Sequence, residues 1–255
     1  MIEGIRGVLL DVDGTLLDGD AAIPGAAECI GRLRRQGVSF RLTTNTTRRP
    51  RSAIAAALQK VGIQVEPREI VVPASLACRR IVESGRTATA LFVPEASKED
   101  LAQVREVRTN PDWLVVGDLG QGFTFDRLNE AFRHLRAGAR FIALHKNPYW
   151  RPGPEGFVLD AGPFVAALEY ASGVRAEVVG KPSSAFFEIA LEELALPGRD
   201  TVSVGDSLEN DCVGAAAAGC RTILVRTGVF SERVLEDAPS KPDHVVDSIA
   251  DLFKE

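Results

Sequence analysis

Short apolar runs alternate with longer amphipathic stretches in the first quarter of the chain. Residues 5–10 form an apolar run bounded by glycine and aspartate, which predicts a buried strand. From Pro24 the apolar positions recur every three or four residues, and this spacing predicts a helix that ends at Gly37. Residues 38–42 predict a second strand, and residues 50–61 predict a second helix.

The last eighty residues repeat this order of elements. Residues 183–196 and the alanine-rich residues 208–218 have the spacing of helices. Residues 201–204 and 221–225 are short apolar runs typical of buried strands. Strands that alternate with helices form parallel βαβ units. The two ends of the chain therefore predict one layered α/β sheet.

The middle of the chain has a series of elements of its own. The expected strands cover residues 89–93, 113–116 and 141–144, and the expected helices cover residues 125–137 and 163–172. About a hundred residues suffice to bury a separate core. We therefore expect a core domain of residues 1–74 plus 179–255, and an inserted α/β domain of residues 75–178.

Composition narrows the class of protein. The chain has 255 residues, 45% of them hydrophobic, with a formal net charge of −5. This composition excludes a mainly disordered chain and argues against nucleic acid as the main partner. No apolar run approaches the roughly 18 residues of a membrane span, and the N-terminus does not resemble a signal peptide. The four cysteines form no C-x-x-C pair, so we expect free thiols, no zinc site and a cytoplasmic protein.

The strongest chemical signal is the pentapeptide DVDGT, residues 11–15, at the end of the first predicted strand. Ligands of open α/β sheets bind beyond the carboxyl ends of the strands. Asp11 and Asp13, two residues apart there, can converge on a hard cation such as Mg²⁺. A plain polar turn is the alternative. The glycine comes three residues after Asp11 and not five, which argues against an EF-hand.

Two further segments suit phosphate. Residues 43–47, TTNTT, follow the second predicted strand, where hydroxyls and backbone N–H groups bind phosphate oxygens but also cap helices. Lys181, in the sequence Gly-Lys-Pro, would neutralise phosphate charge as a compact cation, or be an ordinary surface lysine. The Gly-Lys pair is not a P-loop, because Arg175 and Pro182 stand where glycine and a hydroxyl residue are needed.

A fourth segment, GDSLEND at residues 205–211, again follows a predicted strand and precedes a helix. Asp206 would be a third magnesium ligand, and Asp211 would reach back from the first turns of the helix. An acidic cap, favourable at the N-terminus of a helix, is the alternative. That explanation fits one aspartate better than two.

Taken together, D-x-D-G-T, T-N, K-P and G-D-x-x-x-x-D resemble the haloacid dehalogenase (HAD) superfamily, and the insertion resembles the large cap of its NagD-like branch. The resemblance implies an α/β fold: a HAD-like Rossmannoid parallel sheet with an inserted α/β cap domain of the C2 type. It also implies a magnesium-dependent phosphohydrolase that forms an aspartyl-phosphate intermediate. Asp13 argues against dehalogenation, because that reaction needs no acid for a leaving oxygen.

The resemblance assigns roles to individual residues. Asp11 would be the nucleophile, Asp13 the general acid and base, and Lys181 the catalytic cation. Mg²⁺ would be held by Asp11, the backbone carbonyl of Asp13, and Asp206. The substrate-binding residues would be Thr44, Asn45, Thr46, Lys181 and Asp211. Many relatives have a second acidic residue where this chain has Ser207, so metal binding would depend more on Asp206 and Asp211.

The resemblance leaves the substrate open among small phosphate esters, phosphoamides and pyrophosphate. Residues 145–151 of the insertion, HKNPYWR, combine cations with aromatic rings, so we expect either substrate contacts there or an ordinary surface loop. Relatives with such caps often pair, which implies a homodimer through the cap. The alternative function is a non-catalytic binding or interaction protein that has kept the fold. Such a protein would be expected to have lost Asp11, Asp13, Lys181 or Asp206, and this chain has all four.

Overall fold

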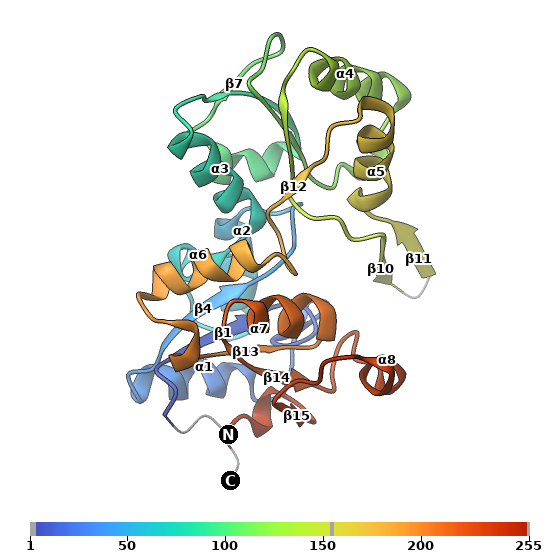
Figure 1. Cartoon of the computed structure of the whole chain (residues 1–255). Coiled ribbons are helices and arrows are strands. Elements are labelled where there is room, and N and C mark those ends of the chain that lie inside the picture. The colour runs from blue at the N-terminus through green and yellow to red at the C-terminus, as the bar shows by residue number, and fades with distance from the viewer. Residues whose placement is uncertain (1–3, 154–155, 254–255) are drawn as a thin grey trace. The chain divides into compact units, whose positions relative to one another are not determined.

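The two ends of the chain form one parallel sheet of six strands in the order β15-β14-β13-β1-β4-β5. The computed structural model describes residues 4–153 and 156–253 (Figure 1). The strands of this sheet are β1 (Gly7–Asp11), β4 (Ser39–Thr43), β5 (Ile70–Val71), β13 (Thr201–Gly205), β14 (Arg221–Val225) and β15 (His244–Val246). The parallel α/β architecture expected from the sequence is confirmed.

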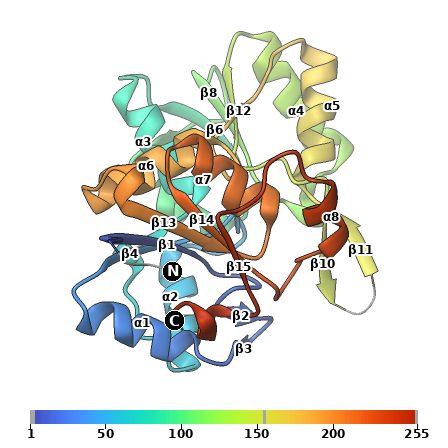
Figure 2. The same cartoon turned by 60° about the horizontal axis from the view of Figure 1, so that its bottom comes forward.

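Helices cover both faces of the sheet. They are α1 (Ala26–Arg35), α2 (Arg51–Lys60), α6 (Ser184–Leu194), α7 (Gly214–Ala217) and α8 (Glu232–Asp237). Figure 2 shows α6 and α7 on one side of the sheet and α1 and α2 on the other. Because both faces are covered, the central strand β1 is buried throughout, which explains its unbroken apolar sequence. A short antiparallel pair, β2 (Leu17–Asp18) and β3 (Ala21–Ala22), follows β1.

The middle of the chain forms a second parallel sheet, of five strands in the order β12-β9-β8-β6-β7. Its strands are β6 (Ala88–Phe92), β7 (Arg105–Glu106), β8 (Trp113–Val116), β9 (Arg140–Ala143) and β12 (Glu177–Val178). Helices α4 (Phe125–Arg136) and α5 (Ala161–Ser172) pack on one face around Leu135, Phe141 and Val165. Helix α3 (Pro73–Glu83) lies on the other face (Figure 1). An antiparallel pair, β10 (Tyr149–Gly153) and β11 (Gly156–Leu159), stands apart from this sheet.

The chain divides into two compact units. The core unit comprises residues 1–44, 51–71 and 181–255, and the insert unit comprises residues 45–50 and 72–180. The insert unit thus begins three residues before residue 75 and also takes in the short segment 45–50. No helix among the described residues is long and apolar enough to cross a membrane.

Two of the differences between the observed and the expected elements lie at strand ends near the aspartates of the core unit. Strand β4 ends at Thr43, one residue later than expected, because Thr43 still pairs with Asp11 of β1 and Val71 of β5. The expected helix over residues 208–218 begins with a wider π-helical turn, η5 (Leu208–Val213), before α7. Ser207 caps this turn by accepting a hydrogen bond from the Asn210 backbone N–H. Such wide turns occur often at functional sites.

Candidate active site

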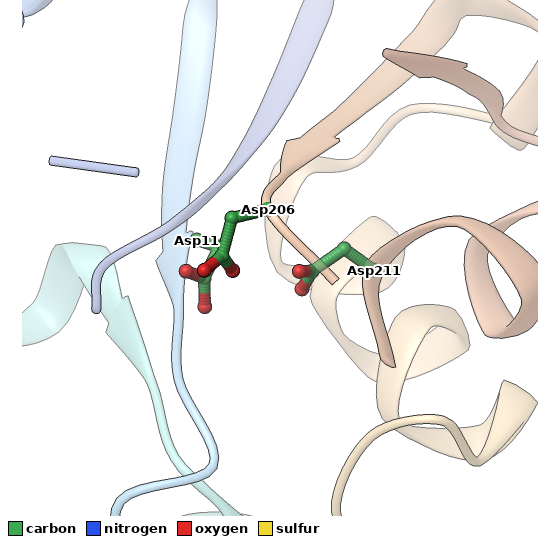
Figure 3. Close-up of side chains that lie close together, drawn as sticks. All are labelled: Asp11, Asp206 and Asp211. Atoms are coloured by element: carbon green, nitrogen blue, oxygen red, sulfur yellow. The ribbon is translucent and has the colours of Figure 1, made fainter. Parts of the chain in front are cut away.

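Three aspartates converge at the carboxyl end of the core sheet. Asp11 is the last residue of β1, and Asp206 directly follows β13, the neighbouring strand. Asp211 comes from the π-helical turn η5. One carboxylate oxygen of each residue lies within 4.8 Å of those of the other two, and all three residues are buried (Figure 3). The structure therefore brings together three of the predicted site residues.

Lys181 joins two of these aspartates. Its side chain is 2% exposed, and its Nζ donates hydrogen bonds of 2.6 Å to Asp11 Oδ1 and of 2.6 Å to Asp211 Oδ1. The other oxygen of Asp211 accepts a 3.0 Å hydrogen bond from the Ser207 backbone N–H. A lysine that is this deeply buried and doubly paired is not the ordinary surface lysine that the sequence had left as an alternative.

Asp206 is held by a loop that follows β14. The Val229 backbone N–H donates a 2.7 Å hydrogen bond to Asp206 Oδ2. Gly14 and Gly228 both have positive φ angles, and a Cβ atom at either position would lie 2.0 Å or 1.8 Å, respectively, from the same oxygen. Both positions therefore require glycine, for the conformation of the backbone and for the room that Asp206 occupies.

The burial of these charges shifts their pKa values. Burial raises the pKa of Asp11 well above its usual range, against the opposing influence of Lys181. Burial, together with the nearby charge of Asp211, raises the pKa of Asp206 to about 7. Burial alone would lower the pKa of Lys181, but Asp11 and Asp211 outweigh it, so the net shift is upward. Lys181 is therefore a fixed cation beside carboxylates that resist ionisation.

The donor set fits a divalent cation. With Asp11, Asp206 and Asp211 ionised, three carboxylates face a single ammonium group, which leaves a formal excess of two negative charges in a buried place. Carboxylate oxygens are the ligands that Mg²⁺ prefers. Asp211 belongs to this group of carboxylates. The resemblance had implied Asp11, the backbone carbonyl of Asp13 and Asp206 as ligands, with a greater dependence on Asp206 and Asp211 because Ser207 is not acidic.

Asp13 has a different environment from Asp11. Its side chain is exposed, and its Oδ2 accepts a 3.2 Å hydrogen bond from Thr44 Oγ1. Thr44 is buried and directly follows β4. Asn45 and Thr46 come next in the chain, are partly buried and belong to the insert unit. The core unit thus presents a buried carboxylate at Asp11 and an accessible one at Asp13.

Three further parts of the site had no individual role in the sequence interpretation, although Thr15 and Thr43 lie within the segments that it singled out. Thr15, which is fully buried, donates a 3.2 Å hydrogen bond to Asp11 Oδ2. Thr43 is the register neighbour of Asp11 at the end of β4. Gly228 and Val229 shape the surroundings of Asp206. The hydroxyl residues Thr15 and Thr43 stand within or next to the recognised motifs in the sequence. The loop at Gly228 and Val229 contacts Asp206 through its backbone, which the sequence does not reveal.

The expected substrate loop, residues 145–151, lies in the insert unit. Lys146 Nζ donates a 2.5 Å hydrogen bond to Glu169, and His145 is buried beside Asp160. Both residues therefore have structural partners inside their own unit. The side chain of Arg151 lies outside the described part of the structure.

Comparison with known proteins agrees with this fold. A model of haloacid dehalogenase-like hydrolases matches residues 8–107, and a HAD-hydrolase-like model matches residues 178–252. Human phospholysine phosphohistidine inorganic pyrophosphate phosphatase is 35% identical over 98% of this chain and 93% of its own. A bovine haloacid dehalogenase-like hydrolase domain-containing protein 2 is 38% identical over 89% of this chain and 86% of its own.

Solved structures show the same similarity. NagD from E. coli superposes with a TM-score of 0.90 at 28% identity, over 97% of this chain and 98% of its own. A 4-nitrophenylphosphatase from Thermotoga maritima superposes with a TM-score of 0.93 at 29% identity, over 100% of this chain and 98% of its own. The chain belongs to the haloacid dehalogenase-like hydrolases, with the fold of a HAD core and a cap. Within that family it is a phosphatase of the NagD-like branch.

Proposed function

We propose that this phosphatase is magnesium-dependent and transfers the phosphoryl group of a small phosphorylated compound to Asp11 before hydrolysis. The observation that supports this most directly is the buried group of Asp11, Asp206, Asp211 and Lys181 at the carboxyl end of the core sheet. It combines a nucleophilic carboxylate, a fixed cation and donors for a metal. Positioning and charge neutralisation of this kind account for most of the catalysis in phosphoryl transfer.

The first half-reaction would use Asp11 and Asp13. A carboxylate oxygen of Asp11 attacks phosphorus, the bond from phosphorus to the leaving oxygen or nitrogen breaks, and Asp13 donates a proton to the leaving group. The exposure of Asp13 supports this role, because it must meet the leaving group and then water. The hydrogen bond from Thr44 Oγ1 to Asp13 Oδ2 would orient that carboxyl group.

The second half-reaction would reverse the role of Asp13. Asp13 takes a proton from a water molecule, the water oxygen attacks phosphorus, and the bond between Asp11 and phosphorus breaks to release phosphate. Lys181 would stabilise the negative charge of the transferring group throughout, as Asp211 holds its ammonium in place. Thr44, Asn45 and Thr46 would bind the phosphoryl oxygens.

Asp11, Asp206 and Asp211 would hold the magnesium ion, together with the Asp13 carbonyl, and the ion would supply charge neutralisation of the phosphoryl oxygens.

The resemblance to the HAD family supports several further proposals. Residues 1–74 plus 179–255 would act as the catalytic core and residues 75–178 as the cap, which would also form a homodimer contact. The enzyme would be cytoplasmic and would act on a phosphate ester, a phosphoamide or pyrophosphate, as the names of its relatives suggest.

The test is covalent labelling of Asp11. The wild-type chain, mixed with a ³²P-labelled phosphate ester and Mg²⁺ and quenched with acid within milliseconds, should retain acid-stable label. Asp11→Asn should retain none and should have no turnover, because an amide is a poor nucleophile. Asp18→Asn, at an exposed aspartate of the same unit, is the matched control and should label normally. Label or turnover in Asp11→Asn would rule out the proposed nucleophile.

A further inference from the structure

The loop that follows β14 contacts two parts of the candidate site at once. Thr227 Oγ1 donates a 2.5 Å hydrogen bond to the Gly14 backbone carbonyl, although 213 positions separate the two residues. Two residues further on, the Val229 backbone N–H donates to Asp206 Oδ2 at 2.7 Å. We call residues 227–229 the clamp loop. Within the core unit, the clamp loop therefore joins the DVDGT turn to the end of β13.

The backbone at Gly14 has to be held from outside. Gly14 directly follows Asp13, and its φ angle of 93° lies in the left-handed region. A side chain is excluded there, because a Cβ atom would lie 2.0 Å from Asp206 Oδ2. Glycine is also the residue whose backbone has the most conformational freedom. The turn beside the proposed general acid is thus built on the residue that restrains it least.

Hydrogen bonds at both peptide groups of Gly14 supply this restraint. Its N–H donates a 2.6 Å hydrogen bond to the Leu17 carbonyl, and this bond fixes the peptide plane that joins Gly14 to Asp13. Its carbonyl accepts the hydrogen bond from Thr227 Oγ1, and this bond fixes the plane that joins Gly14 to Thr15. Removing the Thr227 hydroxyl would therefore release one of the two peptide planes.

The clamp loop is itself anchored on both sides. Arg226, which precedes it, forms an ion pair with Glu232 of α8, and its guanidinium carbon lies 5.0 Å from the centroid of the Phe230 ring. The Arg226 backbone N–H donates a 2.9 Å hydrogen bond to the Val246 carbonyl of β15. The Phe230 backbone N–H donates to the Thr227 carbonyl at 3.2 Å. The Thr227 hydroxyl thus acts from a fixed support.

We infer that Thr227 is a positioning residue for the general acid. By fixing the Gly14 carbonyl, it keeps the backbone next to Asp13 in one conformation, so that the Asp13 carboxyl group meets the leaving oxygen. In this role Thr227 acts through Asp13 and not on the substrate itself. The inference rests on the proposed function, in which a proton passes from the Asp13 carboxyl group to the leaving oxygen as the bond from phosphorus to that oxygen breaks.

The experiment measures kcat/KM, with Mg²⁺, for three aryl phosphates whose leaving groups become less acidic: 2,4-dinitrophenyl, 4-nitrophenyl and phenyl phosphate. The most acidic leaving group departs without a proton, whereas the least acidic one depends on the general acid. Thr227→Val removes the hydroxyl at a similar side-chain shape. It should lower kcat/KM about three- to tenfold for phenyl phosphate and less than about twofold for 2,4-dinitrophenyl phosphate. Thr227→Ser, which keeps the hydroxyl, should restore the wild-type ratio between the substrates.

Thr222→Val is the matched control. Thr222 lies on the same strand, β14, and its hydroxyl donates a 3.1 Å hydrogen bond to Asp243 Oδ2. It stands near the start of β14, whereas the clamp loop follows the end of that strand, so this variant should keep the wild-type ratio. Asp13→Asn removes the acid itself and should change the ratio more than Thr227→Val does. Each ratio is compared with the wild-type ratio for the same substrates, so contacts of the aryl ring cancel.

The inference is overturned if Thr227→Val lowers kcat/KM for all three substrates by one common factor or leaves it unchanged. It is also overturned if Thr227→Ser does not restore the ratio, or if Thr222→Val changes the ratio as much as Thr227→Val. A changed ratio in Asp13→Asn beside any of these results confines the failure to Thr227. An unchanged ratio in Asp13→Asn would overturn the acid role of Asp13 in the proposed function, and the role of Thr227 with it.

Discussion

Replacing Lys181 by methionine should destabilise the core unit strongly, because it removes the only ammonium group that contacts the aspartate cluster among the described residues. The side chains of Lys181, Asp11 and Asp211 are 2%, 7% and 2% exposed. Breaking a buried ion pair by removing one partner costs about 3–5 kcal/mol, since the other partner is left as an uncompensated buried charge. Native domains have only about 5–15 kcal/mol of stability, so roughly a fifth or more of it would be lost.

The assay is urea unfolding followed by far-UV circular dichroism, with a chelator present so that no cation replaces the lost ammonium. With a slope of about 2–3 kcal/mol per molar urea, the midpoint should fall by more than about 1 M. Adding Asp211→Asn to Lys181→Met should recover part of the loss, because it removes one unpaired charge. Lys60→Met, at an exposed lysine of α2, should change the stability by no more than about 0.5 kcal/mol. A loss below about 1 kcal/mol for Lys181→Met, or no recovery in the double variant, would refute this reasoning.

Three other predictions concern the metal, a glycine and a histidine. Chelation should abolish phosphatase activity, and Mg²⁺ should restore it far better than Ca²⁺, whose larger and looser shell would misplace the Asp11 carboxylate; full activity in excess chelator would contradict this. Gly228→Ala should weaken Mg²⁺ binding at least about tenfold, because its Cβ would displace Asp206; the activity titrated against Mg²⁺ measures this, and Gly219→Ala, at a positive φ angle but with nothing near its Cβ, controls for backbone strain alone. Burial lowers the pKa of His145, against the charges of Asp160 and Asp118, so the unfolded chain binds this proton more readily. The stability contributed by the neutral ring is therefore lost as the pH falls below about 6.5. His145→Gln should make the free energy of urea unfolding depend less on pH below about 6.5. An unchanged pH dependence would exclude this role of His145.

The parts of the site that the sequence predicted share one property: they stand at the ends of strands that the apolar pattern reveals. Asp11 and Asp206 end or follow such runs, and parallel strands bring their carboxyl ends to one edge of the sheet. Lys181 is separated from Asp11 by 170 positions, and spacing alone does not connect them. Only the resemblance to the HAD family placed Lys181 and Asp11 in one site, and the 2.6 Å hydrogen bond from Lys181 Nζ to Asp11 Oδ1 is the physical reason for that placement.

What the sequence could not reveal depends on backbone and on long-range packing. The Val229 N–H that holds Asp206 is a backbone group, which every residue except proline carries. Strands β5, β12 and β15 are two or three residues long, and their apolar signal is too short to recognise. Helix α3 was missed although Pro73 stands at its first turn and its buried face includes Leu76 and Ile81.

The places where the chain passes between its two units limit how the gene can change in length. These borders fall after Thr44, Pro50, Val71 and Gly180. Two of them adjoin residues of the phosphoryl site, since Thr44 bonds to Asp13 and Lys181 bonds to Asp11 and Asp211. One added residue at either of these borders would shift a side chain whose hydrogen bonds tolerate only tenths of an ångström. Insertions and deletions that diversify this enzyme are therefore expected within the insert unit, in loops such as residues 107–112, and not at its junctions with the core.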